Sequence, residues 1–191
     1  MSRLRVLVAD DDPIIRLDLK QMLANLGYEV VAEAGDGNEA VLLARSVKPD
    51  VCVLDVRMPE RDGISAVAEL VSEGIAAAIL LTAYSDQELV QKATEAGAFA
   101  YLIKPFKPQD LPPAIEVAVS RFRQTQTLHK QVHELNQRLE ARRIIERAKG
   151  MLMRKQGISE EEAYARIRQR SMETRRSMRE VAEAILMTDD M

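Results

Sequence analysis

Carboxylate, hydroxyl and ammonium groups stand at the ends of four apolar runs, and together they could carry out phosphoryl transfer. The residues Asp10 to Asp12 follow the first run, Asp55 ends the third, Thr82 ends the fourth, and the fifth leads into Lys104. Clustered carboxylates favour a hard cation such as Mg²⁺, and a hydroxyl and an ammonium group would offset phosphoryl charge while a carboxylate attacks. Taken singly, each residue also suits a helix cap or a solvated surface position.

The apolar runs have the length of β-strands, and their nearly continuous apolarity indicates strands covered on both faces. Helical patterns fill the intervals, and Gly27, Gly74 and Gly97 stand where helix C-caps are expected. Five strand-helix repeats predict a doubly wound α/β fold with a five-stranded parallel sheet and a site beyond the C-terminal strand ends. The expected strands are Leu4–Ala9, Glu29–Ala32, Val51–Leu54, Ala78–Leu81 and Ala100–Ile103, and the fourth helical stripe comprises Leu89, Val90, Ala93 and Ala96.

Length and composition indicate a folded chain that forms either one large domain or one domain with a small appendage. The chain has 191 residues, of which 47% are hydrophobic and 30% charged. Its aromatic content of 4%, without Trp, argues against base-stacking platforms for single-stranded nucleic acid. A single cysteine, Cys52, excludes an internal disulfide and a cysteine-built zinc site. No apolar run reaches the roughly 18 residues of a membrane span, and no signal peptide is recognisable, so we expect a cytoplasmic protein without membrane contact.

Charge is distributed unevenly along the chain. Between Arg138 and Arg179 there are 13 Lys or Arg residues and 6 Asp or Glu residues, whereas the remainder holds 14 basic and 24 acidic residues. A basic segment of this kind indicates an anionic partner such as nucleic acid, although a solvated helical surface has the same composition.

Long helices are expected after Pro113. Apolar residues recur at spacings of four, three and four residues, which is the pattern of a coiled coil, here called the seam. The seam could serve a homodimer or an intramolecular contact. Three short helices are expected beyond it, from Ile144 to Met153, Ser159 to Arg170 and Ser177 to Leu186, the second opening with a capping box. The seam residues are Leu128, Val132, Leu135 and Leu139.

Residues 3–123 resemble the receiver domain of two-component response regulators. The resemblance implies that Asp55 accepts a phosphoryl group from a sensor histidine kinase and works as a switch rather than as a turnover enzyme. It also implies that Asp11, Asp55 and the carbonyl of Arg57 hold Mg²⁺, with Asp10 acting largely through water. The motifs that carry it are Val8-Ala9-Asp10-Asp11-Asp12, Leu54-Asp55-Val56-Arg57-Met58-Pro59-Glu60-Arg61-Asp62-Gly63, Leu81-Thr82-Ala83 and Gly97-Ala98-Phe99-Ala100-Tyr101-Leu102-Ile103-Lys104-Pro105-Phe106.

The same resemblance assigns roles to three further residues. Thr82 and Lys104 would contact the phosphoryl group, and Tyr101 would swing inward with Thr82 on activation. The family also implies a cis peptide bond between Lys104 and Pro105, which the small trans preference of X-Pro bonds permits. Asp12 and Tyr84 match variable positions and receive no chemical role.

Four segments of the C-terminal part carry a second resemblance, namely Arg142 to Met153, Gly157-Ile158-Ser159, Glu162-Ala163-Tyr164 and Arg175-Arg176-Ser177-Met178. By these segments, residues 135–187 resemble the ANTAR domain of transcription antitermination regulators. The resemblance implies binding of stem-loops in nascent RNA, so that a terminator does not form. Basic and small residues suit contacts with RNA phosphates and loops. The candidate RNA contacts are Arg147, Lys149, Gly150, Arg154, Arg168, Arg175 and Arg176.

Two other outputs remain open at this point, namely binding of DNA and docking of a protein partner by the C-terminal helices. The expected domains are the receiver at 1–123, a coiled-coil linker at 124–141 and the helical RNA-binding domain at 142–191. His129 and His133 stand four residues apart, a spacing that suits a metal pair or, without further ligands nearby, a solvated helix face.

Overall fold

A computed structural model describes residues 3–83, 91–92 and 94–187. The chain divides into two compact units, residues 1–127 and residues 128–191. Within the described ranges, no helix combines the length and the apolar character needed to cross a membrane.

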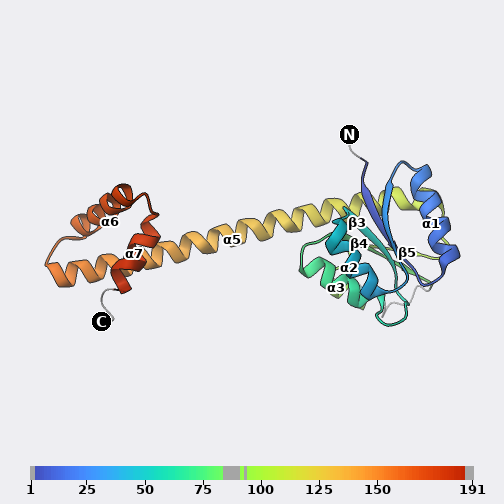
Figure 1. The fold of residues 1–191 in the computed structure, drawn as a ribbon, viewed down its shortest axis with the longest axis horizontal. Coiled ribbons are helices and arrows are strands. Elements are labelled where there is room, and N and C mark those ends of the chain that lie inside the picture. Colours follow the sequence, from blue (N-terminus) through green and yellow to red (C-terminus); the bar gives the residue numbers. More distant parts are fainter. Residues whose placement is uncertain (1–2, 84–90, 93, 188–191) are drawn as a thin grey trace. The chain divides into compact units, whose positions relative to one another are not determined.

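The first unit contains the predicted five-stranded parallel sheet, with the strand order β2-β1-β3-β4-β5 (Figure 1). After β2 the chain crosses to the other side of β1, where β3, β4 and β5 follow in order. The sheet is therefore doubly wound, which confirms the predicted fold class. The strands are β1 (Arg5–Ala9), β2 (Glu29–Ala34), β3 (Val51–Asp55), β4 (Ala77–Thr82) and β5 (Ala100–Ile103).

Both faces of the sheet are covered, which explains the continuous apolarity of its strands. Alternate residues of β1, β3 and β4 point to opposite faces. One set packs against helices α2 (Gly37–Val47) and α3 (Gly63–Ser72). The other set packs against α1 (Pro13–Asn25) and the start of α5 (Leu111–Gln156). Phe122 of α5 meets Phe99 edge to face, with ring centroids 5.8 Å apart, so the helix after β5 packs on the first unit.

The first three helices each begin after an aspartate that caps the helix. The side chains of Asp12, Asp36 and Asp62 accept hydrogen bonds from backbone N–H groups of the first turn. The predicted stripe from Leu89 to Ala96 falls partly on residues 84–90 and 93, which lie outside the described residues. The helices are α1 (Pro13–Asn25), α2 (Gly37–Val47) and α3 (Gly63–Ser72).

The helix α5 (Leu111–Gln156) differs from the sequence-based expectation at both ends. It follows a short 3-10 turn, η1 (Pro108–Asp110), and begins before Pro112 and Pro113, because proline is tolerated in a first turn that lacks intrahelical N–H bonds. The expected separate helix from Ile144 to Met153 is wrong, since these residues continue α5. Gly150 alone does not end a helix, and the first left-handed glycine after the seam is Gly157.

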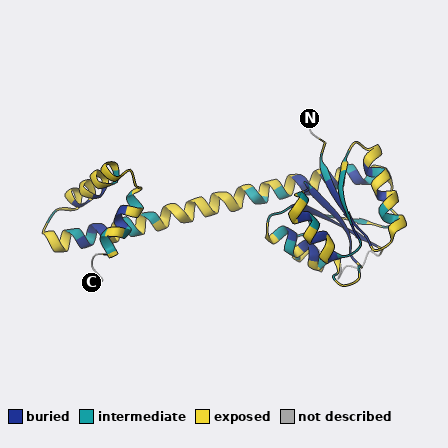
Figure 2. Cartoon of the chain, in the orientation of Figure 1, coloured by how far each residue is buried: buried dark blue, intermediate teal, exposed yellow. Residues whose placement is uncertain are grey.

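The second unit is completed by α6 (Glu160–Thr174) and α7 (Met178–Met187). The predicted capping box at the start of α6 is present, with Ser159 and Glu162 bonding each other's backbone N–H groups. Figure 2 shows that the seam stretch of α5 is exposed and that buried residues return where α6 and α7 pack. The core of this unit consists of Ala148, Ile167, Val181 and Ala182, with Ile144, Ile145, Leu152, Met178, Ile185 and Leu186 against it.

Candidate functional site

The ends of four adjacent strands bring the predicted polar residues to one edge of the sheet. Ala9 of β1 pairs with Leu54 of β3, so the next residues of the two strands, Asp10 and Asp55, are neighbours. Thr82 ends β4 beside Ile103, which places Lys104 next to it. Asp10, Asp55 and Thr82 are buried, with exposed fractions of 1%, 7% and 5%.

The ammonium group of Lys104 joins the two buried carboxylates. Its Nζ lies 2.6 Å from Oδ2 of Asp10 and 2.5 Å from Oδ1 of Asp55. The backbone N–H of Lys104 donates to the carbonyl of Thr82 over 2.7 Å, and the peptide bond between Lys104 and Pro105 is cis, as predicted. One lysine therefore serves two aspartates at the position where the sequence predicts a site.

Two carboxylates and one ammonium leave an excess negative charge in a buried place. Burial raises the pKa of Asp55 above its ordinary value, and the charge of Asp10 acts in the same direction against the opposing effect of Lys104. For Lys104, burial lowers the pKa, but the hydrogen bonds to both aspartates outweigh that effect and raise it. The site therefore favours an additional positive charge.

The loop after β3 is held tightly against the acidic edge. The backbone N–H of Arg57 donates to Oδ2 of Asp55 over 2.8 Å, which fixes the carboxylate. Gly63 donates to the carbonyl of Val56, and a Cβ on Gly63 would lie only 2.0 Å from the carbonyl oxygen of Asp55. The chain can make this turn only because residue 63 has no side chain.

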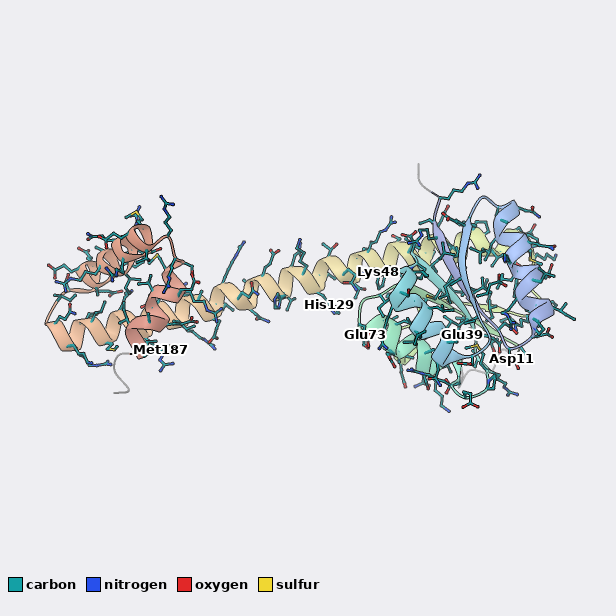
Figure 3. The ribbon with its side chains drawn as sticks, viewed as in Figure 1. Asp11, Glu39, Lys48, Glu73, His129 and Met187 are labelled. Carbon is teal, nitrogen blue, oxygen red and sulfur yellow. The ribbon has the colours of Figure 1, made fainter. Side chains whose placement is uncertain are left out.

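The three consecutive aspartates have different surroundings. Asp12, which received no chemical role, is the N-cap of α1, and its N–H donates to Oδ1 of Asp10. Asp11, labelled in Figure 3, is exposed. Arg16 donates to the carbonyl of Asp10 over 2.5 Å, a positioning contact that sequence inspection missed because nothing in its spacing distinguishes it from a solvated helix residue.

Tyr101 lies on β5, paired with Leu80 and 46% exposed. Its ring is on the surface in this structure, whereas the role inferred from the resemblance involves a move inward. The predicted switch residue thus lies on the strand that leads into Lys104.

In the second unit, five of the candidate RNA contacts are exposed arginines, and Gly150 is half-buried. A Cβ on Gly150 would have no neighbour nearer than Nη1 of Arg154, at 3.7 Å. His129 and His133 are exposed on α5, and no three metal-ligating side chains converge in the described part of the chain. The exposed arginines are Arg147, Arg154, Arg168, Arg175 and Arg176.

Lys149 does not behave as a surface contact. Its side chain is only 8% exposed, and its Nζ lies 2.9 Å from a carboxylate oxygen of Glu146 and 2.7 Å from one of Glu160. The hydrogen bond with Glu160, followed by that with Glu146, raises the pKa of this lysine. The ammonium ties α5 to the first turn of α6. We infer from this pairing that Lys149 has a structural role, in place of the expected contact with RNA.

Comparison with known families matches both parts of the chain. The model of the response regulator receiver domain matches residues 6–116, and the model of the ANTAR domain matches residues 133–186. The chain belongs to the response regulator family. The transcriptional regulatory protein PdtaR of Mycobacterium tuberculosis is 52% identical over 184 residues, which cover 96% of this chain and 90% of PdtaR. This response regulator therefore resembles PdtaR along both of its domains.

Some relatives of this response regulator match a shorter part of the chain. The chemotaxis protein CheY of Thermotoga maritima is 38% identical over 58% of this chain and 93% of its own length. Among solved structures, the receiver domain of NarL from M. tuberculosis matches 64% of this chain and 98% of its own, with a TM-score of 0.58 and 29% identity. A CheX–CheY–BeF3–Mg complex from Borrelia burgdorferi matches 59% of this chain and 86% of its own, with a TM-score of 0.55 and 26% identity.

Proposed function

We propose that this response regulator accepts a phosphoryl group on Asp55 from a sensor histidine kinase and then binds stem-loop RNA in nascent transcripts, so that termination is prevented. The observation that carries the first half is the Lys104 ammonium, which is shared by the buried carboxylates of Asp10 and Asp55. The ANTAR match and the exposed arginines of the second unit support the second half. We propose that it acts in the cytoplasm, where it would meet both the kinase and nascent transcripts.

The transfer step follows from the positions of the side chains. An oxygen of the Asp55 carboxylate attacks phosphorus and forms an O–P bond, while the N–P bond to the kinase histidine breaks and its electron pair stays on the imidazole nitrogen. Lys104, already 2.5 Å from Asp55, offsets charge on the phosphoryl oxygens. The Thr82 hydroxyl, at the end of β4, donates to one of these oxygens after transfer.

The donor set fits Mg²⁺, which would supply charge neutralisation at the transferred phosphoryl group. Asp10 and Asp55 provide hard oxygen ligands in a place with excess negative charge, and Asp11 and the carbonyl of Arg57 stand next to them in the chain. No three carboxylates converge among the described residues, but Mg²⁺ is commonly held by one or two carboxylates with waters and phosphate oxygens. We therefore propose Asp10, Asp11, Asp55 and Arg57 as its ligands, with Asp10 acting largely through water.

The readout of phosphorylation is proposed to pass through β4 and β5. When Thr82 turns to donate to the phosphoryl group, it vacates space that the half-exposed ring of Tyr101 then occupies. The surface formed by β5 and α5 changes as a result, and α5 continues into the ANTAR domain without interruption. The proposed change at β5 would therefore be transmitted to the output domain through one continuous helix.

The proposed RNA surface includes one face of α5. Arg147, Gly150 and Arg154 are spaced by three and four residues, so they lie on the same side of the helix. A glycine inside a helix costs about 1 kcal/mol relative to alanine, and nothing in the described structure blocks a Cβ at Gly150. Close approach of an external partner explains this glycine better than internal packing does.

The seam on α5 is proposed to join two copies of the chain. Its residues are exposed by 60%, 57%, 57% and 49% from Leu128 to Leu139, and their spacing is self-complementary. In heptad notation Leu128 and Leu135 are d residues, whereas Val132 and Leu139 are a residues. A β-branched a residue with leucine at d favours a parallel two-stranded coiled coil. A dimer would present two ANTAR domains to paired stem-loops.

The two alternative outputs predict different ligands for the same arginines. We would measure the affinity of the full chain for a tandem stem-loop RNA and for duplex DNA over a salt series, with and without a small-molecule phosphodonor. Selective RNA binding that strengthens on phosphorylation is the expected result. Equal affinity for the duplex would favour the DNA-binding alternative, and no binding to either would favour a protein partner.

Arg175 provides a variant that separates stability from binding. It caps α6 in the left-handed conformation, with φ of 54°, where glycine is preferred. Arg175→Gly is therefore expected to unfold at the same or a higher temperature, with a gain of up to about 1 kcal/mol. Its RNA affinity should fall threefold to tenfold, with a smaller salt dependence, because a phosphate contact is lost.

Lys149→Met is the matched control for Arg175→Gly, since it removes a positive charge that is buried and already paired. Its RNA affinity should stay within twofold of the wild type. Unchanged binding by Arg175→Gly, or a loss in Lys149→Met equal to that of Arg175→Gly, would contradict the proposed surface.

A further inference from the structure

The apolar seam stops at Leu139, although α5 continues as a helix to Gln156. The next d position holds Arg142, and the g and e positions that flank it hold Arg138 and Arg143. All three arginines are exposed, and none of them forms an ion pair within the described part of the chain. These residues are called the arginine cluster below.

Packing within the second unit explains why the seam ends there. Immediately after Arg143, Ile144 and Ile145 turn to the core formed with α6 and α7. Ile144, Ile145 and Leu152 of α5 therefore cover their own domain and are not free to continue the seam. The arginine cluster occupies the junction between the seam and the helical core.

The nearest carboxylates are engaged elsewhere or stand apart. The charge of Glu140 contributes to the raised pKa of Arg179 on α7, whose side-chain hydrogen bond to Glu183 is the main cause. Glu146 pairs with Lys149. Glu134, which precedes the cluster by one helical turn, forms no ion pair among the described residues. The cluster thus keeps its positive charge within this domain.

A parallel dimer would bring two clusters together. In the heptad register, Arg142 faces Arg142 of the second copy, and Arg138 lies beside Arg143 of the second copy. Six guanidinium groups around one helix pair repel one another and oppose dimerisation. Guanidinium groups also bind phosphate oxygens with paired hydrogen bonds, so a phosphate backbone at this place would reverse the repulsion.

We infer that the arginine clusters of two copies form an RNA-phosphate site that exists only in the dimer, so that RNA binding and dimerisation strengthen each other. This inference rests on the proposed function, and it adds contacts distinct from Arg147 and the α6–α7 turn. A ligand that binds only the dimer lowers the dimer dissociation constant. Bound RNA would therefore also shift the protein from the monomer to the dimer.

Sedimentation of the full chain tests this inference, with and without phosphodonor. The dimer dissociation constant is measured at low and high salt, and with one short RNA hairpin, which is too small to tether two copies by binding each separately. The test variant is Arg138→Gln/Arg142→Gln/Arg143→Gln. The control is Lys130→Gln, which removes an exposed charge from the f position of the same helix.

For the wild type and Lys130→Gln, the hairpin is expected to tighten dimerisation at least tenfold, and salt alone should tighten it by screening repulsion. The triple variant should dimerise at least threefold more tightly than the wild type at low salt without RNA, and the hairpin should change its dimerisation less than twofold. Full RNA-linked tightening in the triple variant would overturn the inference. Hairpin binding without any effect on wild-type dimerisation would overturn it while leaving the proposed function intact, whereas no hairpin binding at all would overturn both.

Discussion

The Asp55→Asn variant is expected to take up no phosphoryl group from a small-molecule phosphodonor or from a kinase. An amide oxygen is too weak a nucleophile to form the acyl phosphate, and no other carboxylate at the site is held by both Lys104 and the N–H of Arg57. The measurement is labelling of the purified chain followed by intact-mass spectrometry. Retained labelling at wild-type stoichiometry would disprove the acceptor assignment.

Loss of labelling in Asp55→Asn should not come from unfolding. The substitution leaves Lys104 paired with Asp10, one ammonium with one carboxylate, so the excess negative charge of the site disappears. Because burial raises the pKa of Asp55, its ionised form costs stability at neutral pH, and a neutral side chain of the same shape removes that cost. The free energy of unfolding in magnesium-free buffer should change by no more than about 1 kcal/mol. Phosphorylation-dependent RNA binding should be lost in the same variant.

The Gly63→Ala variant is expected to disrupt the receiver far more than its one added carbon suggests. The new Cβ would lie 2.0 Å from the carbonyl oxygen of Asp55 and 3.2 Å from Cδ2 of Leu80. The first neighbour is backbone of a buried central strand, which cannot move aside as the end of a flexible side chain could. We expect a loss of about 3 kcal/mol or more, seen as a fall in the receiver's Tm of roughly 10 °C, together with slower phosphorylation.

Gly150→Ala is the matched control for Gly63→Ala. The same atom is added within α5, where its nearest neighbour is the flexible end of Arg154 at 3.7 Å. This variant should be more stable than the wild type by about 1 kcal/mol, because alanine is the better helix residue. Equal thermal stability of the two glycine variants would contradict the prediction that a Cβ at residue 63 clashes with the carbonyl oxygen of Asp55 and destabilises the receiver.

Much of the receiver was predictable from sequence because its local patterns agree with its global fold. The expected strands lie within two residues of the observed ones, since parallel strands covered on both faces need continuous apolar runs. The rule that parallel strands present their C-terminal ends at one edge was enough to group Asp10, Asp55, Thr82 and Lys104.

The helical region was predictable in pattern but not in continuity. The seam spacing and the capping box at Ser159 are local features, and both lie where expected. Whether Ile144 begins a new helix or extends α5 depends on the packing of α6 and α7, which no local signal records. The same limit applies to Lys149, whose type and neighbours suggest a surface cation until Glu160 is placed beside it.

The sequence by itself determined the strand and helix pattern, the acidic and basic residues at the strand ends, and the seam, because each follows from spacing along the chain. Only the tertiary structure decided that one ammonium serves Asp10 and Asp55 together, that Lys149 is buried, and that the seam ends where α5 joins its domain core. These facts concern distances between residues far apart in sequence. Such distances depend on how whole elements pack, and hydrophobic periodicity specifies only which face of an element is buried.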